Sequence, residues 1–126
     1  MAELTPYLAV RDARGAIDWY VEHLGARVTY EPIVMPDGRI GHTQLSVDGA
    51  SWMMADEHPE LHVQAPDPQR GASVTLHLTT GDVDALTRRA VAGGATLDRG
   101  PEDSPAGRVA VLRDPFGHRW LFNQLA

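Results

Sequence analysis

The sequence predicts an α+β fold built from two copies of a strand–helix–three-strand unit. In both halves of the 126-residue chain, a short apolar stretch precedes an aspartate that can cap a helix, and each expected helix ends at glycine followed by alanine. The spacing of later glycines also repeats, since Gly25 to Gly38 and Gly94 to Gly107 each span 13 positions. Capping aspartates and glycines that recur in the same order indicate a duplicated βαβββ unit.

The first unit is expected to open with a strand at 4–10, in which Leu4 is a core residue. A helix capped by Asp12 should follow from about Ala13 to His23, because apolar residues at helical spacing give it one buried face. Three strands complete the unit, at 26–34, 40–47 and 51–55, with turns at 36–39 and 48–49.

The second unit repeats this order with a strand at 73–79 and a helix from the Asp82 cap to about Ala92. An extended segment begins at 95–97, and strands follow at 109–113 and 118–125. Residues 114–117, Asp-Pro-Phe-Gly, are of types that favour a turn, and Asp114 is expected to accept hydrogen bonds from nearby backbone amides. We therefore treat residues 1–126 as a single domain with a first module at 1–57, a proline-containing linker at 58–71 and a second module at 72–126.

Composition excludes several classes of function. The formal charge of −6 is a weak argument against a nucleic-acid partner and would favour a cationic ligand, although its default role is to keep the protein soluble. No apolar stretch approaches the roughly 20 residues of a membrane helix. The chain has no cysteine, which excludes disulfides and thiolate metal sites and suits a cytoplasmic protein.

Six short motifs, in order along the chain, resemble one known family. They lie at 8–12, 16–20, 24–26, 81–85, 92–95 and 114–120. Together they resemble the glyoxalase / bleomycin-resistance / extradiol dioxygenase superfamily, also called the vicinal oxygen chelate superfamily. The resemblance implies two βαβββ modules in an eight-stranded, incompletely closed, barrel-like sheet with helices on its outer face. It also implies a homodimer with a ligand cavity in each cup.

Strand alternation assigns side chains to the cup. Leu45 and Val47 should pack under a helix, which turns His42 and Gln44 inward. The same reasoning places Val109 and Val111 in the helix layer. The candidate ligand-binding residues are Tyr7, His42, Gln44, Trp52, Met54, His77, Leu112, Leu121 and Asn123. The two histidines could equally be ordinary surface or hydrogen-bonded residues, and Trp52 could be a core or dimer-contact residue.

The resemblance also allows a test for metal binding. Metal-dependent members place histidine or glutamate at four inward positions, which fall here on Thr5, Met54 (within one residue), Thr75 and Leu121. None of these side chains can replace an imidazole or a carboxylate. We therefore expect no metal, no cofactor and no catalytic residue, with His42, His77 and Asp56 as a remote alternative ligand set.

Three functions follow from these observations. The first is a metal-free protein that binds and sequesters a small, partly aromatic molecule, for which antibiotics are a candidate class. The second is a lyase, isomerase or dioxygenase that acts on a small oxygenated substrate in the same cup. The third is an accessory partner of a biosynthetic enzyme.

Overall fold

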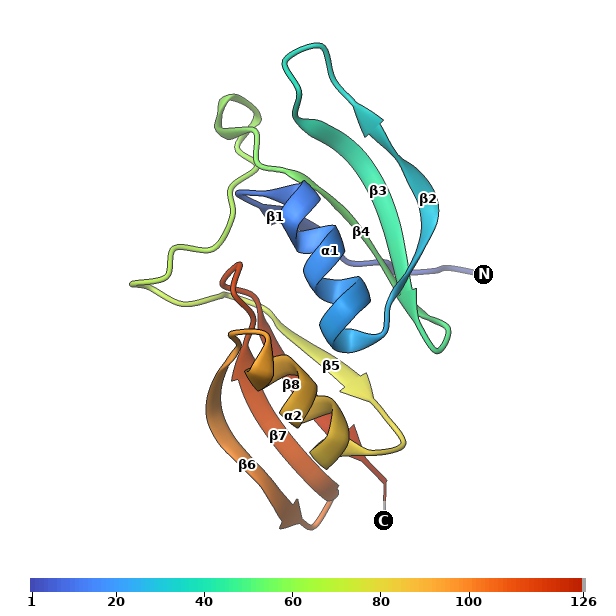
Figure 1. The fold of residues 1–126 in the computed structure, drawn as a ribbon, viewed down its shortest axis with the longest axis vertical. Helices are drawn as coiled ribbons and strands as arrows, with labels where there is room; N and C mark the ends of the chain where they lie inside the picture. The colour runs from blue at the N-terminus through green and yellow to red at the C-terminus, as the bar shows by residue number, and fades with distance from the viewer. Residues whose placement is uncertain (126) are drawn as a thin grey trace. The chain divides into compact units, whose positions relative to one another are not determined.

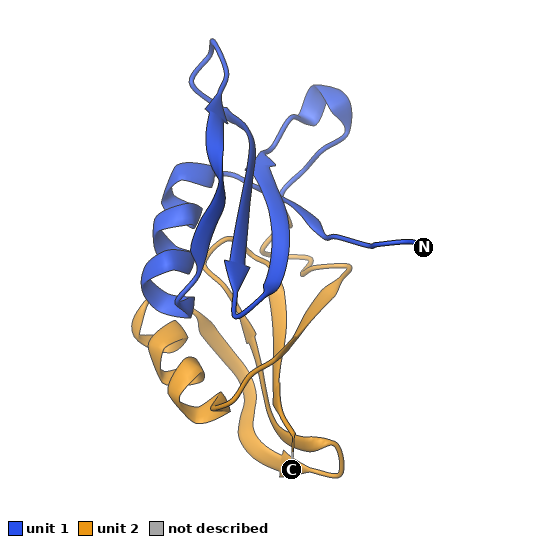
Figure 2. Ribbon diagram, turned by 90° about the vertical axis from the view of Figure 1, so that its right-hand side faces the viewer, with its two compact units in different colours: residues 1–65 blue, residues 66–126 orange. Residues whose placement is uncertain are grey.

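The computed structural model describes residues 1–125, and its chain divides into two compact units at the boundary between Ala65 and Pro66 (Figure 2). Both units have the predicted strand–helix–three-strand order (Figure 1). The first contains β1 (Tyr7–Val10), α1 (Ala13–Leu24), β2 (Arg27–Val34), β3 (Ile40–Val47) and β4 (Ala50–Asp56). The second contains β5 (Thr75–Thr79), α2 (Val83–Ala92), β6 (Thr96–Ser104), β7 (Gly107–Arg113) and β8 (Arg119–Gln124). A short 3-10 helix, η1 (Pro59–Leu61), precedes the boundary.

The two units share one sheet topology. The first sheet has the order β1-β4-β3-β2 and the second has β5-β8-β7-β6. In each sheet the first and last strands of the unit pair in parallel, and the remaining pairs are antiparallel. Within residues 1–125 the eight strands therefore form two four-stranded sheets and no closed barrel, which confirms the predicted α+β class.

One helix covers one face of each sheet (Figure 2). Under α1, Leu45 and Val47 are buried as predicted, together with Tyr20 of the helix itself. Under α2, the buried residues include Trp120 and Phe122. We call the opposite face of each sheet its helix-free face, because side chains there are not covered by the helix of their own unit.

The helices begin and end at the predicted capping residues. The side chain of Asp12 accepts a hydrogen bond from the Gly15 amide at 3.0 Å, and Asp82 accepts one from the Ala85 amide at the same distance. The first helix ends at Gly25, whose φ of 71° lies in the left-handed region that glycine adopts without steric cost. These local signals are sufficient to set where both helices begin and where the first one stops.

The strand ends depart from prediction in two places. The first strand begins at Tyr7, and Leu4 lies outside it with a 96% exposed side chain, so its expected core role is wrong. The extended segment predicted to begin at 95–97 continues through Ser104, because β6 pairs with β7 along most of its length.

Candidate ligand-binding face

Three of the predicted residues come together on the helix-free face of the first sheet. The Tyr7 hydroxyl lies 2.7 Å from Nδ1 of His42, and Nε2 of the same imidazole lies 3.1 Å from Nε2 of Gln44. Strand pairing explains the cluster, because Tyr7 and Gln44 both stand directly opposite Met53 of β4. Cross-strand partners share a face, so residues from three strands meet on one side of the sheet.

The hydrogen bonds in this cluster form a directional chain. The Gln44 amide nitrogen can only donate, so Nε2 of His42 accepts and its proton resides on Nδ1. Nδ1 then donates to the Tyr7 oxygen, and the Tyr7 hydroxyl donates to the carbonyl of Gly41 at 3.2 Å. Each donor in this chain therefore meets an acceptor when the imidazole carries its proton on Nδ1.

Aromatic rings border the cluster. Tyr30 of β2 contacts the His42 ring edge-on, with centroids 4.9 Å apart, and the Tyr7 ring lies 5.4 Å from it. Both tyrosines remain accessible, at 52% exposure for Tyr7 and 46% for Tyr30. Partial burial of the side chain raises the pKa of Tyr7.

Sequence reasoning missed Tyr30 and Met53. Both lie next to Gln44 in the ladders, so the signal that finds them is the strand register. Alternation within one strand cannot supply this signal, particularly in β2, where the register shifts three times along its pairing with β3.

The register also corrects two face assignments. Trp52 stands opposite Leu45, and Met54 stands opposite Thr43, so both lie on the face that α1 covers. The Trp52 ring contacts Tyr20 of α1 edge-on at 5.3 Å, and both Trp52 and Met54 are buried. The expectation that they face the cup is wrong, because they share the face of the helix-covered residues of β3.

In the second sheet, three predicted residues share the helix-free face and one does not. His77 is paired with Leu121, which is in turn opposite Val111, while Asn123 lies two residues farther along β8. Leu112 is opposite Trp120, so it belongs to the buried layer beneath α2. The predicted faces of β7 are therefore reversed: Val109 and Val111 lie on the helix-free face, and Ala110 and Leu112 lie on the helix side.

Asn123 has an unused acceptor. Its side chain is 6% exposed, and its Oδ1 atom is buried with no hydrogen-bond partner among residues 1–125. Unpaired buried acceptors are costly, and they are found where a ligand or an ordered water completes the bonding.

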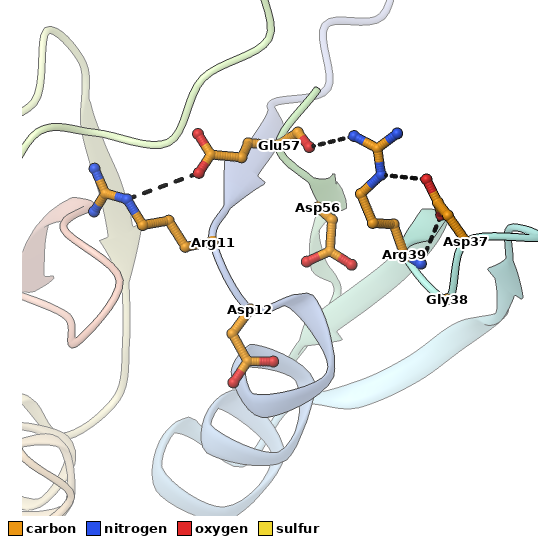
Figure 3. A pocket seen from close by; sticks show the side chains of 7 residues that line it. All are labelled: Arg11, Asp12, Asp37, Gly38, Arg39, Asp56 and Glu57. Atoms are coloured by element: carbon orange, nitrogen blue, oxygen red, sulfur yellow. Dashed lines mark hydrogen bonds and ion pairs between the residues drawn. The ribbon is translucent and has the colours of Figure 1, made fainter. Parts of the chain in front are cut away.

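A separate pocket of about 370 Å³ lies at the start of α1, beside the turn between β2 and β3 (Figure 3). Its wall carries two arginines, Arg11 and Arg39, and its carboxylates are already engaged. Both oxygens of Asp56 accept backbone bonds, from Ala13 at 2.8 Å and Ile40 at 2.6 Å, and Glu57 pairs with Arg11. Asp56 thus anchors two elements and lies on the helix side, which removes it from the alternative set with His42 and His77.

The donor atoms needed for a metal are not gathered in the described part of the chain. Among residues 1–125, no three histidine, aspartate or glutamate side chains are close enough to hold one ion. Of the positions that the resemblance assigns to metal ligands, Thr75 accepts a hydrogen bond from Arg119, and Leu121 is hydrocarbon. Within the same range, no helix is long and apolar enough to cross a membrane.

Comparison with solved structures identifies proteins of the same fold. TioX from Micromonospora sp. ML1 is 26% identical with a TM-score of 0.72, and the match covers 99% of this chain and 97% of that one. TnmS3, an antibiotic binding protein from Streptomyces sp. CB03234, is 28% identical with a TM-score of 0.68, over 99% and 98% of the two chains.

Sequence comparison agrees with the structural one. The protein Rv0887c of Mycobacterium tuberculosis is 40% identical over 125 residues, which span 96% of this chain and 73% of the relative. Residues 3–122 match the Glyoxalase/Bleomycin resistance protein/Dioxygenase superfamily. The repeated βαβββ units and these matches together show that the chain belongs to the Glyoxalase/Bleomycin resistance protein/Dioxygenase superfamily.

Proposed function

We propose that this protein binds and sequesters small aromatic molecules on its helix-free faces, without a metal, as a cytoplasmic homodimer. The observation that carries the proposal is the Tyr7–His42–Gln44 chain, bordered by Tyr30, on an accessible face of the first sheet. Such a cluster combines rings that can stack with polar atoms of defined direction, which is the usual composition of a small-molecule site.

The cluster keeps hydrogen-bonding capacity for a ligand. A glutamine amide offers one acceptor oxygen and two N–H donors, and His42 takes only one of the donors of Gln44. The contact with the His42 imidazole holds the amide in place, so the remaining groups are preorganised for binding.

Two further findings support capture in preference to metal-dependent chemistry. TnmS3, with 28% identity across nearly the whole chain, is an antibiotic binding protein, which makes antibiotics a ligand class to test. The side chains at the family's metal-ligand positions, including Thr5, Thr75 and Leu121, are also poor metal ligands. The net charge of −6 would draw cationic molecules from a distance, whereas local groups determine which contacts a bound molecule makes.

The test is a titration of aromatic antibiotics followed by NMR of the histidine and tyrosine side chains. Tryptophan fluorescence is a weaker reporter, because all three tryptophans are buried. We expect ligands to shift the His42 imidazole and Tyr30 ring signals, and Gln44→Ala to weaken binding. A panel of drugs and metabolites that leaves these signals unchanged at high micromolar concentration would contradict the proposal.

Metal analysis of the same sample separates capture from the enzymatic alternative. Protein purified without chelator should contain no stoichiometric nickel, zinc, iron or manganese. A stoichiometric transition metal would favour a lyase or a dioxygenase instead.

A further inference from the structure

We infer that the helix-free face of the second sheet contains an anion subsite, in which Arg119 binds a carboxylate group of the ligand. The inference rests on the proposed function, because it names a chemical class of ligand for the same kind of surface. It was not anticipated from the sequence, in which the net negative charge pointed toward cations.

Strand pairing arranges the subsite. Arg119 opens β8 and stands directly opposite Thr75 of β5 on one side and Arg113 of β7 on the other. Trp120 is turned into the core beneath α2, so the alternation of β8 places Arg119 on the helix-free face. One guanidinium nitrogen of Arg119, Nη1, donates to the hydroxyl of Thr75 at 2.6 Å, which fixes the position of the side chain.

The charges around Arg119 are not balanced. Arg113 is held by Asp98 in a bidentate pair, with N–O distances of 2.8 and 2.9 Å. Among residues 1–125 no carboxylate forms an ion pair with Arg119, whose hydrogen-bond partner is the neutral Thr75. Asp98 bonds to Arg113, but the positive charge of Arg119 also acts on it, and both arginines lower the pKa of this carboxyl, with Arg113 the larger cause. Within the described residues, two opposed guanidinium groups are thus accompanied by a single nearby carboxylate in a chain whose overall charge is −6.

This arrangement is unfavourable for the sheet alone. Like charges directly opposite each other on antiparallel strands destabilise the pairing, and an acid at either position would relieve the cost. An incoming carboxylate would provide the same relief. The guanidinium group has five N–H donors in a planar fork that matches a carboxylate, and the Thr75 bond uses one of them.

The neighbouring residues can receive the rest of such a ligand. His77 follows Thr75 by two residues on the same face, and Leu121 follows Arg119 in the same way. An aromatic acid bound through Arg119 would lay its ring against this pair. The geometry thus points to small organic acids with an apolar or aromatic body.

The experiment compares phenylacetate with its neutral amide, phenylacetamide, by NMR titration of the full chain at low salt. Phenylacetate should shift the Arg119 Nε–H and Thr75 amide signals, and phenylacetamide should not. Arg119→Gln should weaken phenylacetate binding by roughly tenfold to a hundredfold, the usual effect of a lost charge-assisted bond. Arg119→Lys, which keeps the charge but not the fork, should fall between the two.

The matched control is Arg88→Gln, which removes the same charge from an exposed position on α2. It should bind phenylacetate like the unaltered protein. Equal binding of acid and amide, or unchanged phenylacetate affinity in Arg119→Gln, would overturn the inference. If antibiotics still shifted His42 and Tyr30, the proposed function would stand without the anion subsite. If no compound shifted the NMR signals of either helix-free face, the proposed function and the anion subsite would both be rejected.

Discussion

The Tyr7 hydroxyl oxygen lies 2.7 Å from Nδ1 of His42, across 35 positions of sequence. This contact joins β1 to β3, two strands that are not neighbours in the sheet. Strand β4 lies between them, and its Met53 is the residue paired with Tyr7. The Gln44 amide nitrogen donates to Nε2 of the same imidazole, so the contact with Tyr7 falls on Nδ1, and the second N–H and the carbonyl oxygen of Gln44 remain for a ligand.

Replacing Tyr7 by phenylalanine tests this relationship. The variant keeps the ring but removes the oxygen that accepts from His42, so the Nδ1 tautomer loses its support. We expect the ¹⁵N shifts of the imidazole to report a mixture of tautomers and ligand affinity to fall several-fold. Stability should change by no more than about 1 kcal/mol, because one partly exposed hydrogen bond is lost. Unaltered imidazole shifts would show that the bond does not fix the tautomer.

Alkaline titration should reveal the same phenol. Burial raises the pKa of Tyr7 above its ordinary value near 10. The folded state therefore holds this proton more tightly than the unfolded state, and the resulting stability is present below the unfolded pKa and lost as the pH rises through the folded one. Ultraviolet absorbance of tyrosinate should include a late-ionising step that belongs to Tyr7. The late step should be missing from Tyr7→Phe.

The internal repeat offers a matched pair of anchoring residues. Asp56 ends β4 and accepts from the first amide of α1 and from Ile40, whereas Gln124 ends β8 and accepts from Val83, the first amide of α2, at 2.9 Å. Asp56→Ala leaves two backbone N–H groups without an acceptor and should lower the free energy of unfolding by about 2–4 kcal/mol. Gln124→Ala leaves one such group and should lower it by about 1 kcal/mol. Urea unfolding measures both. Equal losses would contradict the double anchoring role of Asp56.

Adjacent residues of β4 should have opposite phenotypes. Trp52 packs beneath α1, so Trp52→Ala should cost about 3–5 kcal/mol in stability. Met53 lies between Tyr7 and Gln44 on the helix-free face, so Met53→Ala should mainly weaken ligand binding. Thermal unfolding and ligand titration of the two variants separate the roles. A stable Trp52→Ala with lost binding would return Trp52 to the ligand site.

Acid stability should depend on the pair between α2 and β7. Arg108 donates to both carboxylate oxygens of Asp84, at 2.6 and 3.0 Å, and its hydrogen bonds lower the pKa of Asp84 below its ordinary value. The folded state thus binds this proton less readily than the unfolded state, and the stabilisation is present above the unfolded pKa and lost as the pH falls through the folded one. Asp84→Asn should flatten the stability profile below about pH 4. An unchanged acid profile would show that the pair contributes nothing measurable.

Interactions between residues close in sequence determine the helix starts and the turns of this fold. Asp12 and Asp82 cap the helices at the predicted positions, and Asp114 organises its turn by accepting from the amides of Phe116 and His118. The same aspartate also accepts from the indole nitrogen of Trp120. Caps and tight turns involve residues a few positions apart, so neighbouring residue types are enough to predict them.

The candidate site was only partly predictable. His42 and Gln44 were assigned to the helix-free face by alternation with the buried Leu45 on β3, and Tyr7 by alternation with the buried Leu8 and Val10 on β1. For β4, alternation separates the side chains into two sets on opposite faces. It does not show which set lies on the same face as Leu45 of β3. Choosing the face of Trp52 by residue type alone led to the wrong side.

By itself, the sequence determined the duplicated βαβββ order, the helix ends and the turns, since each depends on contacts within a few residues. Only the tertiary structure decided which strands are neighbours and in what register. That register placed Trp52, Met54 and Leu112 beneath the helices, and it brought Arg119 opposite both Thr75 and Arg113. A shift of one residue in pairing turns every side chain of a strand to the other face, so this information resides in the assembled sheet.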